Sequence, residues 1–209
     1  VAIYYAPQLL TSDYANQLVT EQTGKGIPCI AVSADVFTSI ADKENPQGIL
    51  AICDWKGALG LTGLGANNFP WGVALVSPQD PGNVGAILRT LDAVGASGLL
   101  LLEDSVDPTH PSAVRASMGA LFWLPVVRAS FVEFIAWVKE HNYHIYATSA
   151  HGTVDYRQVQ TYIKPNVLLM GSEREGLSPE RRDMVILTGG QVLRIPMCGK
   201  VTSLNLAVA

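Results

Sequence analysis

The sequence lacks the features that anchor a protein in a membrane or stabilise it outside the cell. Its three cysteines, Cys29, Cys53 and Cys198, are far apart, so we expect neither a disulfide framework nor a metal-binding pair. No apolar run is long enough to span a membrane, and no charged-then-apolar signal segment opens the chain. These absences predict a globular protein in a reducing compartment, the cytoplasm.

Charge is also scarce: 15% of the 209 residues are charged, 48% are hydrophobic, and the net charge is −4. This balance disfavours a generic electrostatic DNA-binding protein, which would normally be basic. It leaves open a structured-RNA enzyme with a local basic patch. The four histidines have no carboxylate or cysteine partners at ligand spacing, so we expect no metal site.

Residues 1–56 show an α/β pattern that is small for an independent core. The chain starts without a methionine and stops at 206–209, inside what reads as the start of a helix. We therefore expect a fragment cut at both ends. The expected helices of this first part are 15–22 and 36–41, and its expected strands are 27–32 and 48–53.

A linker is expected at 57–70, where glycine, asparagine and proline occur with no helical or strand period. Its leucines indicate that it is partly packed, and we place the domain boundary here. From 71 to 209, short apolar stretches alternate with amphipathic ones, which predicts an α/β fold with a mostly parallel sheet and helices on both faces. The expected strands are 73–77, 99–102, 126–128, 143–148, 166–170 and 192–195, and the expected helices are 84–95, 112–121, 131–140 and one that starts at Ser178.

Three polar, glycine-marked segments, 81–89, 171–177 and 195–205, each follow a predicted strand. Open α/β sheets bind ligands at the carboxyl ends of their strands. In the first segment, Asn83 is a natural cap for the next helix, and Arg89 lies further along it. Both can reach one anion near the helix N-terminus, although an ordinary capped helix explains this segment alone equally well.

The second and third segments carry stronger signals of a site. Gly171 allows a ligand to approach the strand end, and Glu173 lies in a loop longer than the next helix cap requires. After the strand that ends at Ile195, we expect Ser203 to cap a helix and Asn205 to lie in its first turn. Together the segments predict one polar ligand held largely by backbone groups.

In the identity and spacing of their residues, these segments resemble the SpoU/TrmH-type ribose 2′-O-methyltransferases of the SPOUT superfamily. The likeness covers most of 71–209 and includes 114–120, while 1–56 resembles the tail of the L30e-like RNA-binding domain often fused in front. The resemblance implies a C-terminal trefoil knot, S-adenosylmethionine as cofactor, and a homodimer that packs through the knot region. Knotted chains are rare, so periodicity alone does not predict one.

The resemblance also implies the roles of individual residues. Arg89 is the implied prime catalytic residue, as a proton acceptor or, because a guanidinium stays protonated, as an electrostatic clamp that Glu173 could orient. The implied catalytic set is Asn83, Arg89, Glu173, Ser203 and Asn205. The implied cofactor contacts are Thr148, Gly171, Ile195, Met197 and Leu204.

The expected substrate is structured RNA, with ribosomal RNA favoured over transfer RNA by the fused N-terminal part. An RNA-binding module that has lost catalysis stays open as an alternative. A dinucleotide-dependent oxidoreductase is disfavoured, because no Gly-x-Gly-x-x-Gly turn follows a predicted strand with an acidic residue at the required distance.

Overall fold

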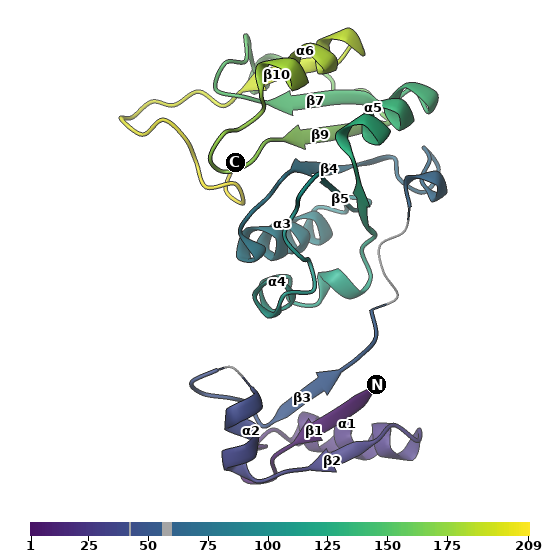
Figure 1. Ribbon diagram of the computed structural model, residues 1–209, viewed down its shortest axis with the longest axis vertical. Helices are drawn as coiled ribbons and strands as arrows, with labels where there is room; N and C mark the ends of the chain where they lie inside the picture. The colour runs from purple at the N-terminus through teal and green to yellow at the C-terminus, as the bar shows by residue number, and fades with distance from the viewer. Residues whose placement is uncertain (42, 56–59) are drawn as a thin grey trace. The chain divides into compact units, whose positions relative to one another are not determined.

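The computed structural model describes residues 1–41, 43–55 and 60–209. The chain divides into two compact units, Val1–Lys56 and Gly57–Ala209, each with its own sheet (Figure 1). Among the described residues, no helix combines the length and the apolar character needed to cross a membrane.

The small unit is a three-stranded sheet with two helices. Its middle strand, β1, pairs parallel with β2 and antiparallel with β3, in the order β2-β1-β3. Leu10, Ala15 and Val19 form its core. The helices and the last two strands fall where the sequence pattern predicts them, whereas the first strand was not predicted. The bounds are β1 Ala2–Tyr5, α1 Asp13–Gly24, β2 Cys29–Ala31, α2 Ala34–Ile40 and β3 Ile49–Ile52.

The large unit contains a seven-stranded sheet in the order β6-β5-β4-β9-β7-β10-β8, and all the strand pairs described in it are parallel. The chain runs outward from β4 to β6 on one side and then places its later strands on the other side. Such a reversal of strand order is where α/β sheets bind ligands. The bounds are β4 Trp71–Val76, β5 Leu99–Leu102, β6 Val126–Ala129, β7 His144–Thr148, β8 Val154–Asp155, β9 Asn166–Met170 and β10 Gln191–Arg194.

Helices cover this sheet. The core cluster on one face takes in Phe134 and Trp137 of α5 and Val185 of α6. Strand residues that alternate with this cluster, such as Leu75, point to the opposite face and are also buried, as is the apolar side of α3 with Leu88. The bounds are α3 Pro81–Ala93, α4 Pro111–Ala116, α5 Phe131–Glu140 and α6 Pro179–Leu187, with single turns η1 Leu61–Gly63, η2 Ala120–Phe122 and η3 Tyr156–Gln158.

The described part of the expected linker, 60–70, packs on the large unit. Leu64 and Phe69 are buried in its core. The Trp137 Nε1–H donates to the Leu64 carbonyl over 3.1 Å, and the Tyr143 hydroxyl donates to the Phe69 carbonyl over 2.6 Å. These bonds anchor the segment, while residues 57–59 of the expected linker lie outside the described residues.

The helix expected over 112–121 is wrong in its second half. Helix α4 ends at Ala116, and the backbone then turns through Met118 (φ 52°) and Gly119 (φ 97°) before η2. A left-handed glycine is a frequent helix terminator, and here it outweighs the apolar residues on either side that suggested continuation.

Candidate functional site

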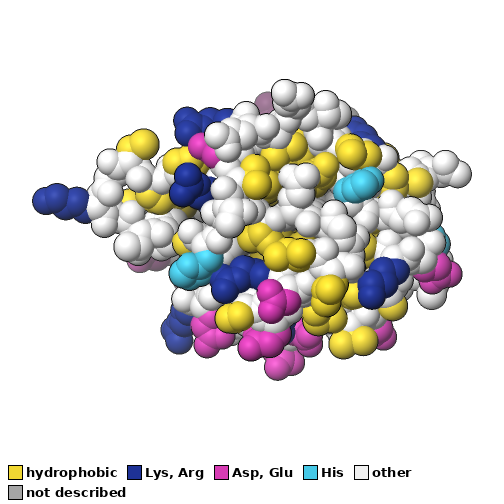
Figure 2. Space-filling model, turned by 90° about the horizontal axis from the view of Figure 1, so that it is seen from above, with side chains coloured by type: hydrophobic (Ala, Val, Ile, Leu, Met, Phe, Trp, Pro, Cys, Tyr) yellow, Lys and Arg dark blue, Asp and Glu magenta, His cyan; other side chains and the backbone are white. Residues whose placement is uncertain are grey.

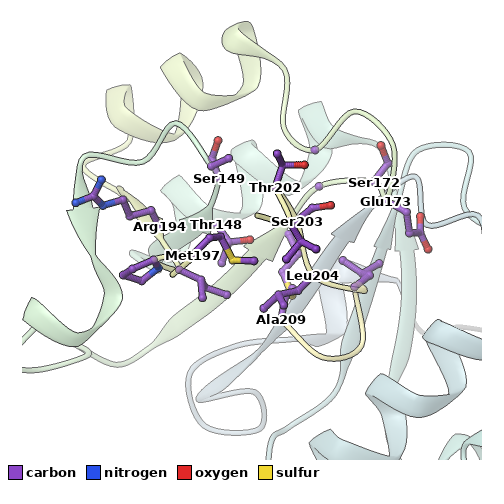
Figure 3. A pocket seen from close by; sticks show the side chains of 18 of the residues that line it. Thr148, Ser149, Ser172, Glu173, Arg194, Met197, Thr202, Ser203, Leu204 and Ala209 are labelled. Atoms are coloured by element: carbon purple, nitrogen blue, oxygen red, sulfur yellow. The ribbon is translucent and has the colours of Figure 1, made fainter. Parts of the chain in front are cut away.

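A cavity of about 560 Å³ lies at the carboxyl ends of β7, β9 and β10. Its lining comes from within 148–150, 170–176 and 194–209, so loops far apart in sequence meet there. Figure 3 shows side chains from these loops gathered around the cavity. Because these strands are parallel neighbours, their loops emerge at one edge of the sheet.

Two of the three predicted segments, 171–177 and 195–205, contribute to the lining of this cavity, and every residue expected to contact the cofactor lies in the lining. Two residues expected to act in catalysis, Glu173 and Ser203, line it as well. Asn83, Arg89 and Asn205 do not. The five expected cofactor contacts that line the cavity are Thr148, Gly171, Ile195, Met197 and Leu204.

The first segment joins the site through hydrogen bonds rather than through the lining. The Asn83 Nδ2–H donates to Glu173 Oε1 over 3.1 Å, and the Asn205 Nδ2–H donates to Asn83 Oδ1 over 3.1 Å. Each residue of this chain of bonds belongs to a different predicted segment. Asn83 therefore ties the loops after β4, β9 and β10 together.

Glu173 also holds the loop that precedes α3. Its carboxylate accepts hydrogen bonds from the backbone N–H groups of Gln79 and Asp80, over 3.2 and 3.4 Å. Partial burial acts to raise the pKa of the Glu173 carboxyl, but the bonds from Asn83 and this backbone outweigh it, so the pKa is lowered. The charged carboxylate is thus the form that the site stabilises.

The expected cap of α3 is wrong. Asp80, not Asn83, is the N-cap, and its side chain accepts from the Gly82 N–H over 2.7 Å. Pro81 follows at the first helical position, where its missing N–H costs nothing, and Asp before Pro is the better start signal. Asn83 is left inside the first turn, buried, with its amide free to bond across the site.

Arg89 lies elsewhere on α3. It is exposed, whereas Asn83 is buried and its amide is hydrogen-bonded to Glu173 and Asn205. No hydrogen bond or ion pair joins Arg89 to Glu173 within the described residues, because the Glu173 carboxylate is engaged by Asn83 and the backbone. The expected orientation of Arg89 by Glu173 is therefore absent from this structure.

The expected helix cap at Ser203 is wrong as well. Residues 201–204 are irregular, and the turn that follows starts at Asn205. The Asn205 Oδ1 accepts from the Ala207 N–H over 2.9 Å, and its carbonyl accepts from the Val208 N–H over the same distance. Asn205 thus uses one end of its amide for this turn and the other for Asn83.

Gly171 is required by its own loop. A Cβ at this position would overlap the backbone of Gly176 and Leu177, and the Gly176 N–H donates to the Ser172 carbonyl over 3.0 Å. From the sequence, this glycine is expected to allow a ligand to approach the strand end. The structure adds that the loop itself folds back against it.

Several lining residues were not singled out from the sequence. Ser149 follows Thr148 at the end of β7, and its Oγ accepts from the Arg182 guanidinium of α6 over 3.2 Å. Thr202 and Leu206 also line the cavity. Their proximity to residues that were predicted is the only sequence signal they carry.

On the face shown in Figure 2, acidic side chains gather along one border, while Lys and Arg side chains are dispersed. No group of three or more potential metal ligands occurs in the part of the chain that the structure describes.

Comparisons of the sequence and of the structure with known proteins both find rRNA methyltransferases. The model of the SpoU rRNA Methylase family matches residues 70–209. The 23S rRNA (uridine(2479)-2'-O)-methyltransferase of Streptomyces viridochromogenes is 33% identical over 218 residues, which cover 99% of this chain and 71% of that protein. The 23S rRNA (guanosine(2553)-2'-O)-methyltransferase RlmP of Bacillus subtilis (strain 168) is 28% identical over 184 residues, which cover 88% and 70%.

Among solved structures, the AdoMet-bound rRNA methyltransferase from Sinorhizobium meliloti matches with a TM-score of 0.82 and 35% identity. The match covers 99% of this chain and 75% of that one. The region that matches the family, 70–209, contains every residue of the predicted site.

Proposed function

The chain belongs to the SpoU rRNA methylase family, and on this basis we propose that it transfers a methyl group from S-adenosylmethionine to a ribose 2′-hydroxyl of structured RNA. The two named relatives are 23S rRNA 2′-O-methyltransferases, which favours ribosomal RNA over transfer RNA. The observation that carries the proposal is the convergence of all five expected cofactor contacts on one cavity.

The cavity suits S-adenosylmethionine in size and in chemistry. Its volume of about 560 Å³ falls within the range of small-molecule sites. Main-chain groups at Gly171, Ile195 and Leu204 would serve an adenine ring as donors and acceptors, and Met197 supplies an apolar wall. When bound, the sulfonium supplies an activated methyl group.

Methyl transfer is an in-line displacement. The ribose 2′-oxygen forms a bond to the methyl carbon as the carbon–sulfur bond breaks, and the hydroxyl proton passes to water. The site must therefore stabilise negative charge on the 2′-oxygen. We assign this task to Arg89, whose guanidinium stays protonated and is better suited to clamp the 2′-oxygen and a neighbouring phosphate than to accept a proton.

The other residues expected in catalysis take different roles in this proposal. Asn83 and Glu173 position the loops, because their polar groups are engaged with one another and with backbone. Ser203 lines the cavity beside the expected cofactor position. Asn205 holds the third loop to Asn83, and this positioning role is the one we assign to it.

We include three features of the family in the proposal: a C-terminal trefoil knot, an L30e-like RNA-binding role for residues 1–56, and a cytoplasmic location. The compact small unit with its own core supports the second of these. Free cysteines at positions 29, 53 and 198 are consistent with the third.

We also propose a homodimer, supported by a second cavity of about 560 Å³ on the large sheet. Trp71, Tyr146 and Tyr162 line it, and it shares Ile195 and Leu204 with the first cavity. An apolar, aromatic surface next to the expected cofactor position suits a partner subunit that completes the site. Sedimentation of the purified protein tests this, and a monomer at micromolar concentration would refute it.

The function is tested with RNA from cells that lack the protein. The RNA is incubated with the protein and tritium-labelled S-adenosylmethionine, and 2′-O-methyl groups are then mapped. We expect one new mark in ribosomal RNA. A mark in transfer RNA alone would replace the substrate, and cofactor binding without any transfer would favour an RNA-binding module.

A further inference from the structure

Three large apolar side chains are exposed in the turn that follows α4. Met118 is 70% exposed, Phe122 is 58% exposed and Trp123 is 60% exposed. We call these residues the apolar turn. They lie outside both cavities, and three exposed apolar side chains within six positions make this turn a candidate binding surface.

Trp123 is held in place although its ring is exposed. Its Nε1–H donates to Asp92 Oδ1 of α3 over 2.7 Å. Its ring also lies against Gly119, where an added Cβ would approach two ring carbons to 3.1 Å. A ring fixed in this way loses little conformational freedom when a partner binds.

Trp123 of the apolar turn lies on the same side of α3 as Arg89. Gly85 of α3 lies directly against Ala116 of α4, and Asp92, two turns further on, contacts Trp123. Positions 85, 89 and 92 share one side of a helix, so Arg89 lies between these two contacts. Figure 1 shows α3 and α4 side by side.

We propose that Trp123, supported by Phe122, is a stacking platform for an unpaired RNA base that flanks the nucleotide to be methylated. Arg89 would hold the phosphate between the two. This inference rests on the proposed function, because it takes RNA to be the molecule that Arg89 contacts. Aromatic side chains stack on bases of any sequence, and RNA is recognised mainly through such unpaired bases.

Charge favours RNA over a protein partner at this surface. Arg89 is exposed, and its guanidinium complements a phosphate. Asp92, the acidic residue on the same side of α3, accepts the hydrogen bond from the Trp123 indole, so its carboxylate is turned toward the ring edge. An aromatic ring beside an exposed guanidinium is the combination found in single-strand binding grooves.

The platform is tested by fluorescence anisotropy with a labelled single-stranded oligoadenosine as the probe. We expect Trp123→Ala to weaken binding roughly tenfold and Trp123→Phe, which keeps an aromatic face, to weaken it much less. The matched control is Leu187→Ala, at a residue of α6 that is 81% exposed, and it should leave binding unchanged. A duplex RNA probe should bind wild type and Trp123→Ala equally.

Wild-type affinity of Trp123→Ala for oligoadenosine would overturn the proposal. So would a change in its sedimentation with unchanged RNA affinity, because the apolar turn would then join two copies of the chain. If Trp123→Ala fails to fold, as judged by thermal unfolding, Phe122→Ala decides instead. We expect it to weaken oligoadenosine binding severalfold, and wild-type affinity there would also overturn the proposal.

A separate measurement keeps this test distinct from that of the proposed function. Wild-type protein is assayed for S-adenosylmethionine binding and for methyl transfer to RNA. Absence of both would remove the proposed function, whereas the oligoadenosine result would still decide whether Trp123 stacks on RNA. With transfer present, Trp123→Ala should raise the KM for RNA and leave kcat close to wild type.

Discussion

The two sides of α3 differ in how their polar residues are placed: one is buried and hydrogen-bonded, and the other is exposed. On the inner side, Asn83 is buried and bonded to both Glu173 and Asn205. On the outer side, Arg89 is exposed beside the contact between Asp92 and Trp123. One helix thus carries a residue that fixes the loops around the cavity and another that is open to an incoming substrate. Asn83 and Arg89, which belong to one predicted segment, therefore have different roles.

The largest effect is expected from a substitution on the outer side of α3. We expect Arg89→Ala to lower the rate of methyl transfer by roughly 10²–10³, because a preorganised charge at the reacting oxygen is lost. The affinity for S-adenosylmethionine should stay at the wild-type value, since Arg89 does not line the cavity. Single-turnover transfer and calorimetry measure the two quantities. Wild-type turnover in this variant would show that Arg89 has no catalytic role.

The inner side should respond differently. We expect Asn83→Ala to lower both the transfer rate and the cofactor affinity, by about tenfold each, because it removes the two hydrogen bonds that join the loops, each worth roughly 0.5–1.5 kcal/mol. Glu173→Gln should have a similar effect, and the double variant should be little worse than either single one, since both break one network.

The control for this pair is Glu175→Gln, an exposed carboxylate in the same loop, which should behave as wild type. The pKa of the Glu173 carboxyl is lowered in the folded protein. The stabilisation that the charged carboxylate gives the loops is therefore complete above the unfolded pKa of 4.5 and is lost as the pH falls through the folded pKa. Cofactor affinity should therefore drop in acid in the wild type but not in Glu173→Gln. Additive effects in the double variant would contradict the network.

Gly171, in the loop after β9, can also be substituted to disturb the loops around the cavity. Gly171→Val should weaken S-adenosylmethionine binding and lower stability by about 1–3 kcal/mol, because the side chain would collide with the backbone at Gly176. Gly199→Ala is the matched control: it lines the same cavity, and an added Cβ there meets nothing within 4 Å. Equal cofactor affinities in the two variants would argue against the fold of this loop.

The smallest expected effect lies away from the site. Tyr143→Phe removes the bond to the Phe69 carbonyl and should cost about 1 kcal/mol of stability, with cofactor affinity unchanged. Burial raises the pKa of Tyr143 to about 12 from an ordinary value of 10.0. Its stabilising contribution is therefore complete below pH 10 and is lost as the pH rises toward 12. Denaturant unfolding across this range should show the loss only in the wild type.

The sequence predicts the elements of this fold well where the signal is local. Helix α5 follows from the spacing of Phe131, Phe134 and Val138, and its start at Ser130 is reinforced by a capping box with Glu133. The two-residue strand β8 has no such signal. The end of α4 depends on the turn at Gly119, which the surrounding apolar pattern hides.

The site is predicted only in part, for a physical reason. The five expected cofactor contacts that line the cavity follow from the resemblance to the family near the strand ends. The bonds between Asn83 and Glu173, 90 positions apart, and between Asn83 and Asn205, 122 positions apart, depend on tertiary structure. Asn83 can cap a helix or bond across a site, and only the presence of Asp80 before Pro81 decides between them.

The most direct test of the account is a crystal structure of the protein with S-adenosylmethionine. We expect the cofactor in the cavity between Gly171, Ile195 and Leu204, with its methyl group turned toward the side where RNA would meet Arg89. Cofactor bound only elsewhere, for example in the aromatic cavity around Tyr146 and Tyr162, would contradict the central claim.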